Sequence, residues 1–182
     1  MTTSGLCPKS AAAAGAAIDP ARLHGTNINP VTGLATDYLN HFNEAIMLLE
    51  MLPSAPECKD DLLAWRPVSY PEHFAASKFR HRDLAIAAYE LADPVFRQEL
   101  DAICQQMNHI LTEAQDGLQG ELARDTIRIL AEATAHWLRQ LVARAGALIN
   151  GESAAVHPAA ETAPQDAIDA LFDQEVEAAV ER

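Results

Sequence analysis

Apolar residues recur at steps of three and four along most of the chain between residues 32 and 150. The first such stretch, TGLATDYLNHFNEAIMLLEML (32–52), predicts an amphipathic helix. Pro53 and Pro56 follow it and end the pattern. The apolar positions of this helix are Leu34, Tyr38, Phe42, Ala45, Leu49 and Leu52.

The segment 58–74 is predicted to connect this helix to the next, since Pro67 and Pro71 break any long helix within it. We expect its apolar residues Leu62, Leu63 and Trp65 to cover the core.

Helical periodicity then predicts a short helix over 82–91 and two longer ones over 94–115 and 121–149. No alternating strand pattern of useful length and no internal repeat interrupts them. The sequence therefore predicts an all-α fold, a helical bundle domain over 32–150 with three to four main helices.

The two ends of the chain have a different composition. Residues 1–31 are rich in Ala, Gly, Pro and Asn without a helical period, which predicts a disordered N-terminal arm and not a signal peptide. Residues 151–163 read as a flexible linker. The chain then closes on PQDAIDALFDQEVEAAVER (164–182), which predicts an amphipathic helix tethered by the linker.

This last segment has one apolar and one acidic face. Its apolar face carries Ile168, Leu171, Phe172, Val176 and Val180. Because an isolated helix of under about 20 residues is marginal in water, it should form mainly when that face finds a groove. The acidic face would steer it to a basic rim on another protein. Packing back on the bundle, or pairing with a second copy in a homodimer, are the open alternatives.

Charge and cysteine content narrow the classes of partner and compartment. The net charge of −13 repels polyanions, which argues against nucleic acid and anionic membrane as partners. Three cysteines without a CxxC pair argue against a disulfide framework and a thiolate zinc site. No apolar run approaches the roughly 18 residues that span a bilayer. We therefore expect a cytoplasmic protein.

The stretch PQDAIDALFD (164–173) resembles the receiver-binding peptides of bacterial chemotaxis. The N-terminal peptide of the flagellar switch protein FliM and the C-terminal helix of CheZ-type phosphatases have related patterns, and both bind the response regulator CheY. The FliM peptide is N-terminal, however, and DQEVEAAVER (173–182) extends beyond the point where the CheZ peptide ends. The resemblance implies contact with a receiver domain through Gln165, Asp166, Ile168, Asp169, Leu171, Phe172 and Val176.

A CheZ-like phosphatase needs only two polar side chains of its own. The family uses an acid followed by Gln four residues later, and related phosphatases use an acid followed by Asn three residues later. The amide holds a water in line with the phosphoryl group. The receiver partner carries the phosphoaspartate and the Mg²⁺, so the resemblance implies no cofactor belonging to this chain.

Two places in the predicted bundle match these spacings. The first is Asp37 with Asn40, extended along one helix face by His41 and Glu44. The second is Asp101 with Gln105, a spacing that chance also supplies in so acidic a chain. We prefer the first as the catalytic set, because DYLNHFNE (37–44) places weak helix formers inside a helix.

Other chemistry finds less support. His41 could relay a phosphoryl group, although the Lys and Gly that usually follow such a histidine are absent. Helical His/Glu pairs could hold a metal if two of them faced each other, but the twin Glu-x-x-His pattern of di-iron bundles is missing, and we predict no metal site. These pairs are His41/Glu44, His109/Glu113 and Glu132/His136.

The sequence thus predicts a signalling protein that binds a receiver domain and possesses, in the sharper hypothesis, phosphatase activity toward its aspartyl phosphate. The competing hypothesis is a non-enzymatic helical adaptor, or an oligomerising protein, that docks through the same C-terminal helix.

Overall fold

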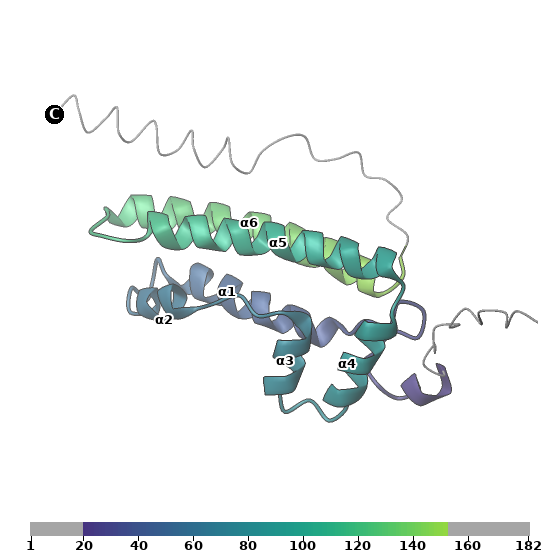
Figure 1. Cartoon of the computed structure of the whole chain (residues 1–182). Coiled ribbons are helices and arrows are strands. Elements are labelled where there is room, and N and C mark those ends of the chain that lie inside the picture. The colour runs from purple at the N-terminus through teal and green to yellow at the C-terminus, as the bar shows by residue number, and fades with distance from the viewer. Residues whose placement is uncertain (1–19, 153–182) are drawn as a thin grey trace, which may run out of the picture.

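The computed structural model describes residues 20–152, and these form an all-α fold (Figure 1). Within this range the only β-type pairing is an isolated bridge between Ile28 and Ala35. The elements are two short 3-10 helices, η1 (Pro20–Leu23) and η2 (Thr36–Leu39), and six α-helices: α1 (Asn40–Met51), α2 (Cys58–Ala64), α3 (Tyr70–Ala76), α4 (Arg82–Leu91), α5 (Pro94–Gly117) and α6 (Arg124–Ile149).

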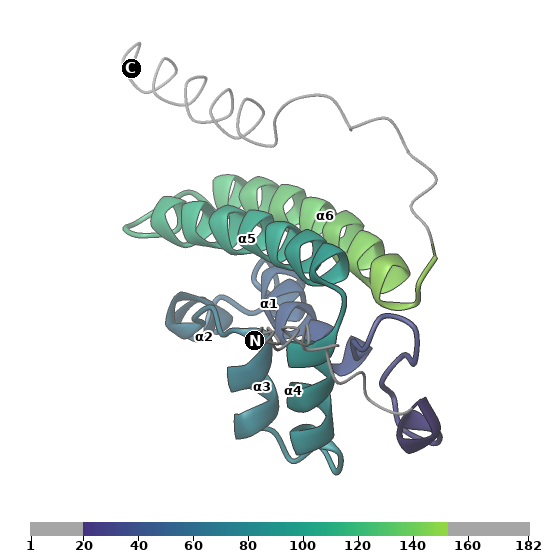
Figure 2. The same cartoon turned by 45° about the vertical axis from the view of Figure 1, so that its right-hand side comes forward.

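The two longest helices, α5 and α6, lie side by side and form one layer, with α1 and α2 beneath them (Figure 1). α6 contacts both α5 and α1, so these three helices enclose the main core. α3 and α4 pair with each other and project from the bundle as a short hairpin (Figure 2). No helix among the described residues is both long enough and apolar enough to cross a bilayer.

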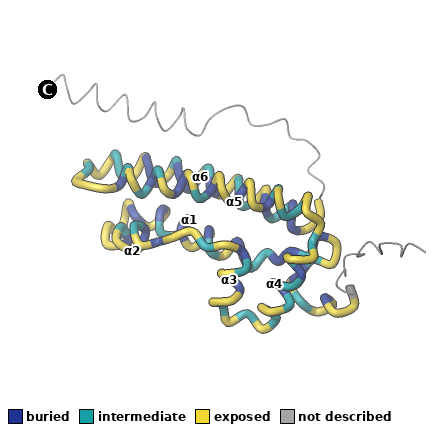
Figure 3. The backbone as a smooth tube through the Cα atoms, in the orientation of Figure 1, coloured by how far each residue is buried: buried dark blue, intermediate teal, exposed yellow. Residues whose placement is uncertain are grey.

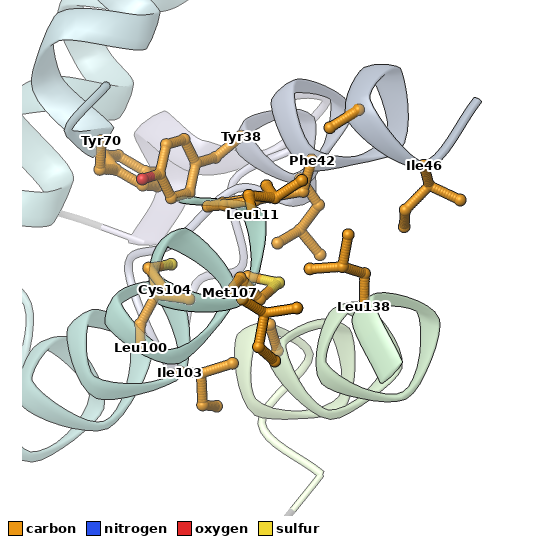
Figure 4. Packing of buried hydrophobic residues seen from close by; sticks show 14 of the residues in the cluster. Tyr38, Phe42, Ile46, Tyr70, Leu100, Ile103, Cys104, Met107, Leu111 and Leu138 are labelled. Carbon is orange, nitrogen blue, oxygen red and sulfur yellow. The ribbon is translucent and has the colours of Figure 1, made fainter. Parts of the chain in front are cut away.

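The core is continuous between the layers, as the buried positions facing inward from each helix show (Figure 3). Figure 4 shows Phe42 of α1 near Leu111 of α5 and Leu138 of α6, all three with no exposed surface. Burying a side chain of this size stabilises the fold by roughly 1.5–3 kcal/mol relative to exposure. The apolar periodicity that predicted the bundle is therefore the periodicity that fills its core.

The segment 58–74 contains two short helices where the sequence predicted a connection. Pro71 begins one of them instead of ending it, because proline lacks only an amide that the first turn leaves unpaired. The Ser69 hydroxyl accepts from the Glu72 amide, and the Glu72 carboxylate accepts from the Ser69 amide, a complete capping box. Leu62 and Trp65 are buried, as the sequence predicted, and Leu63 is half-buried against the core.

The first predicted helix also differs in detail. It begins at Thr36 with η2 and continues as α1, since Gly33 adopts a φ of +71° that no helix accepts. Thr32 is buried, and its hydroxyl donates to the Ile149 carbonyl at 2.7 Å, which joins this segment to the end of α6.

The predicted N-terminal arm of 1–31 is partly folded. Leu23 and Ile28 are buried against the bundle, so the folded part begins earlier than the expected boundary at residue 32. Two apolar residues without helical spacing gave no signal of this packing. Residues 1–19, the linker beyond Glu152 and the predicted docking helix 164–182 lie outside the described residues.

Candidate functional site

The first predicted pair, Asp37 and Asn40, spans the junction between η2 and α1. The Asp37 carboxylate accepts a hydrogen bond from the Asn27 side-chain amide at 3.2 Å. Asn40 is the first residue of α1 and is exposed. The pair therefore combines a partly buried acid that already has a hydrogen-bond donor with an amide that is open to solvent.

His41 is half-buried, so it does not share the solvent-facing position of Asn40. Its ring stacks on the Trp65 indole with centroids 4.5 Å apart and planes 22° from parallel. The indole N–H of Trp65 also donates to the His41 carbonyl at 3.2 Å. A phosphorelay histidine needs an accessible ring nitrogen, whereas the Nε2 atom of His41 is buried.

A second histidine, His73 of α3, lies close to His41, with ring centroids 6.2 Å apart. Burial lowers the pKa of His41, and the neighbouring His73 lowers it further, while the Arg66 backbone and Glu44 oppose the shift. Burial likewise lowers the pKa of His73, opposed by the Asp37 backbone and charge. Both rings are therefore neutral at pH 7, and the buried Nε2 of His41 has no hydrogen-bond partner among the described residues.

Glu44, the last residue of the first set, is exposed at the edge of an open hollow between α1 and α2. The hollow has a volume of about 600 Å³. Its lining is half polar and half apolar and comprises His41, Glu44, Met47, Leu48, Asp61, Ala64, Trp65 and Arg66. Glu44 and Asp61 make its acidic part, and the exposed Met47 adds a flexible apolar surface.

The second predicted pair, Asp101 and Gln105, lies on one continuous helix. Both side chains are exposed and stand one turn apart on α5. The Tyr89 hydroxyl of α4 donates to the two carboxylate oxygens of Asp101 at 2.9 and 3.1 Å. This pair therefore has an acid fixed by a hydrogen bond and an amide open to solvent.

Tyr89 is the residue of this site that the sequence analysis missed. Partial burial, and then the Asp101 carboxylate, raise the pKa of Tyr89 to about 12, so its phenol remains a donor. Arg97 lies over its ring at 5.9 Å. Because Tyr89 is on a different helix from Asp101, the spacing of residues within one helix could not reveal it.

Cys104, between the two residues of this pair, contributes no nucleophile. Its side chain is buried, and burial raises the pKa of the thiol to about 12. The thiolate is the reactive form of cysteine, so a thiol that stays protonated at neutral pH is inert.

The His/Glu pairs considered as metal ligands stay apart in the structure. His109 and Glu113 are 3.9 Å apart on α5, whereas Glu132 of α6 pairs with Arg128 at 3.2 Å. His136 lies 2.8 Å from the amide nitrogen of Gln140. Between residues 20 and 152 no three His, Cys, Asp or Glu side chains are grouped so as to hold a metal ion.

The predicted partner-binding residues fall outside the described part of the chain; they are Gln165, Asp166, Ile168, Asp169, Leu171, Phe172 and Val176. No family model matches the chain, and no curated protein or solved structure is significantly similar to it.

Proposed function

We propose that this chain is a cytoplasmic signalling protein that binds the receiver domain of a response regulator and promotes hydrolysis of its aspartyl phosphate. The binding half of the proposal rests on the residues of PQDAIDALFD (164–173) and their resemblance to receiver-binding peptides. The catalytic half rests on the side chains of α5.

The observation that carries the catalytic half is the pairing of Asp101 with Gln105. Gln105 is exposed on α5, where its amide can hold a water in line with a phosphoryl group presented by a partner. Asp101 stands one turn earlier with its carboxylate held by Tyr89, ready to contact a basic group on that partner. The receiver supplies the phosphoaspartate and Mg²⁺, so this chain contributes position and no cofactor.

The set on α1 is the second candidate for the same role. Asn40 and Glu44 are both exposed, one turn apart, beside the hollow between α1 and α2. We rank this set below the α5 pair because Asp37 and Asn40 lie on different elements, η2 and α1, and His41 is covered by Trp65. The two sets lie on different helices, so single substitutions separate them.

Tethering explains how a weak catalytic contact would suffice. A flexible linker holds a captured receiver at an effective concentration of roughly millimolar near the bundle. The segment 164–182 would therefore set affinity, while the bundle would need to contact the phosphorylated site only transiently.

The decisive experiment measures phosphoaspartate decay in a receiver domain captured by the 164–182 peptide. Gln105→Ala should slow the decay stimulated by the full chain by about 100-fold, the usual loss when one positioned amide is removed. Its neighbour Gln106 is also exposed on α5, and Gln106→Ala is the matched control that should leave the rate unchanged.

The α1 set is tested in the same assay by Asn40→Ala, with the exposed Asn43→Ala as control. Loss of activity in Asn40→Ala, with Gln105→Ala unaffected, would move the site to α1. A chain truncated after Glu152 should bind the receiver much more weakly, and undiminished binding would refute the role of the segment.

One observation favours the alternative function, a non-enzymatic adaptor that is monomeric or dimeric. Both candidate acids accept a hydrogen bond within the chain, Asp37 from Asn27 and Asp101 from Tyr89, so each has a structural use without catalysis. Capture of a receiver with no change in its phosphoaspartate lifetime would support this alternative.

A further inference from the structure

A compact basic surface lies at the far end of the α3–α4 hairpin. Lys78 and Arg80 are exposed in the connection between the two helices, and the exposed Arg82 begins α4; we call these three side chains the basic tip. Within 20–152, neither Lys78 nor Arg80 forms an ion pair. Arg82 pairs with Asp83 at 3.6 Å, but both side chains are largely in solvent, where such a pair contributes little.

This surface stands out in an acidic chain, because no other five consecutive residues between 20 and 152 contain three Lys or Arg. Arg128, Arg139 and Arg144 each face a carboxylate. Lys59 donates to the Gly120 carbonyl at 2.8 Å. Of the three cations of the basic tip, only Arg82 pairs with a carboxylate among the described residues, that of Asp83.

The shape of the hairpin suits contact with another segment. The hairpin projects from the bundle, and its connecting end is the part farthest from α5 and α6 (Figure 2). Ala75 and Ala76 are exposed at the end of α3, and Phe79 is half-buried against Phe74 with ring centroids 5.4 Å apart. Small apolar side chains therefore adjoin the cations, a combination that accepts a chain with both apolar and acidic residues.

We propose that the basic tip docks the acidic segment 164–182 of the same molecule. That segment carries one cation, Arg182, against a set of six acids, Asp166, Asp169, Asp173, Glu175, Glu177 and Glu181. The described residues carry 18 Asp and Glu against 11 Lys and Arg, so their net charge repels such a segment. Charge complementarity therefore selects the basic tip among the surfaces of this chain.

The connection is long enough to allow this contact within one molecule. Gly151, just after α6, lies next to Val31 and Thr32, and the adjoining Gly33 packs against Ala88 and Ala92 of α4. The ten residues of α4 cover about 15 Å from there to the basic tip. Residues 153–163 span up to about 36 Å when extended, so the acidic segment reaches the tip with length to spare.

The contact would hold the segment 164–182 reversibly. It is made by exposed charges, so salt screens it and a partner with a better groove displaces it. The contact lowers the fraction of molecules whose segment 164–182 is free to bind a partner. That fraction falls in proportion to the time that the segment spends on the basic tip. The contact depends only on charges within the chain, so it does not depend on the identity of that partner.

Zero-length carbodiimide cross-linking of the full chain, read by mass spectrometry, tests the contact. Lys78 should form amide cross-links to carboxylates of 164–182, whereas Lys59, the other lysine of the described part, should form few. The yield at Lys78 should fall at least about fivefold between 0.05 M and 0.5 M salt, since screening shortens the Debye length. Equal cross-linking of both lysines to the segment would overturn the proposal.

Charge reversal supplies the matched comparison. Arg80→Glu with Arg82→Glu keeps Lys78 as the reactive group and should abolish its cross-links to the segment. Arg124→Glu with Arg128→Glu makes the same charge change at the start of α6 and should preserve them. Loss of the cross-links in both variants would show a net-charge effect and overturn the assignment.

Mixing labelled and unlabelled protein distinguishes the source of the segment. At low micromolar protein concentration, we expect each cross-link to join Lys78 and a segment peptide that carry the same isotope label, as a contact within one molecule requires. A predominance of mixed-isotope cross-links would overturn the intramolecular form and assign the contact to a second copy. The cross-linking assay contains no receiver, so a negative result there leaves the proposed function unaffected. A negative result in the phosphoaspartate assay likewise leaves this contact unaffected.

Discussion

The Tyr89 hydroxyl of α4 donates to the Asp101 carboxylate of α5 at 2.9 Å, and this bond joins the projecting hairpin to the long helix pair. Tyr89→Phe keeps the ring stacked on Tyr70, whose centroid lies 4.6 Å away, and removes only the hydroxyl. We expect the free energy of unfolding to fall by about 1 kcal/mol, the usual net contribution of such a bond. Urea denaturation measures the change.

The same variant also tests whether Tyr89 positions Asp101. A double-mutant cycle with Asp101→Ala, which removes the acceptor, should give a coupling energy clearly different from zero, because the two groups share one bond. Additive effects of the two substitutions would mean that the bond contributes nothing in solution.

Gly33→Ala should destabilise the fold through a clash as well as backbone strain. Gly33 has a φ of +71°, and a Cβ there would stand 3.0 Å from the Ala88 carbonyl oxygen and 3.2 Å from the Ala92 Cβ. Gly120→Ala is the control, since its φ of +95° gives similar strain but nothing lies within 4 Å. We expect a loss of about 1–3 kcal/mol from the strain alone at either site and a larger loss at Gly33.

Phe42→Ala should cost about 3–5 kcal/mol of unfolding free energy, because Phe42 is fully buried between the layers and truncation leaves a cavity. Met47→Ala on the same helix is the control. Met47 is 50% exposed, and its truncation should change the stability by under about 0.5 kcal/mol. Chemical denaturation measures both variants. Similar losses of unfolding free energy in the two would contradict the described core.

Stability should depend on pH through His41 and His73. Burial lowers the pKa of both rings in the folded chain, whereas the unfolded chain keeps values near about 6.5. The unfolded chain therefore binds more protons in acid, so stability is full above about pH 7 and falls as the pH drops through about 6.5. Urea midpoints between about pH 7.5 and about pH 5.5 measure this loss.

The variant His41→Gln should flatten this profile, because it removes one of the two titrating rings. A wild-type midpoint that stays constant across this pH window would contradict the burial of both rings.

Several elements followed directly from the residues. The helices over 82–91, 94–117 and 124–149 lie close to the predicted ranges, because three- and four-residue apolar spacing is a local property of the chain. The burial of Leu62 and Trp65 was predictable for the same reason. Pro71 misled, because proline ends a helix or begins one according to the cap before it, and Ser69 supplies that cap.

The candidate sites also combine features that local sequence predicts with features that it cannot predict. Spacing predicted that Asp101 and Gln105 would share a helix face, and they do, but it could not reveal Tyr89, which reaches Asp101 from another helix. The composition of DYLNHFNE drew attention to His41, and the structure covers its ring with Trp65, 24 residues further along the chain.

The sequence by itself determined the helices, the inward-facing apolar residues and the acidic, amphipathic character of 164–182, because each is set by residues close together in the chain. Tertiary structure decided which acids are engaged and which histidine is covered. Those properties depend on distant residues such as Tyr89, Trp65 and Asn27, which only packing brings to Asp101, His41 and Asp37.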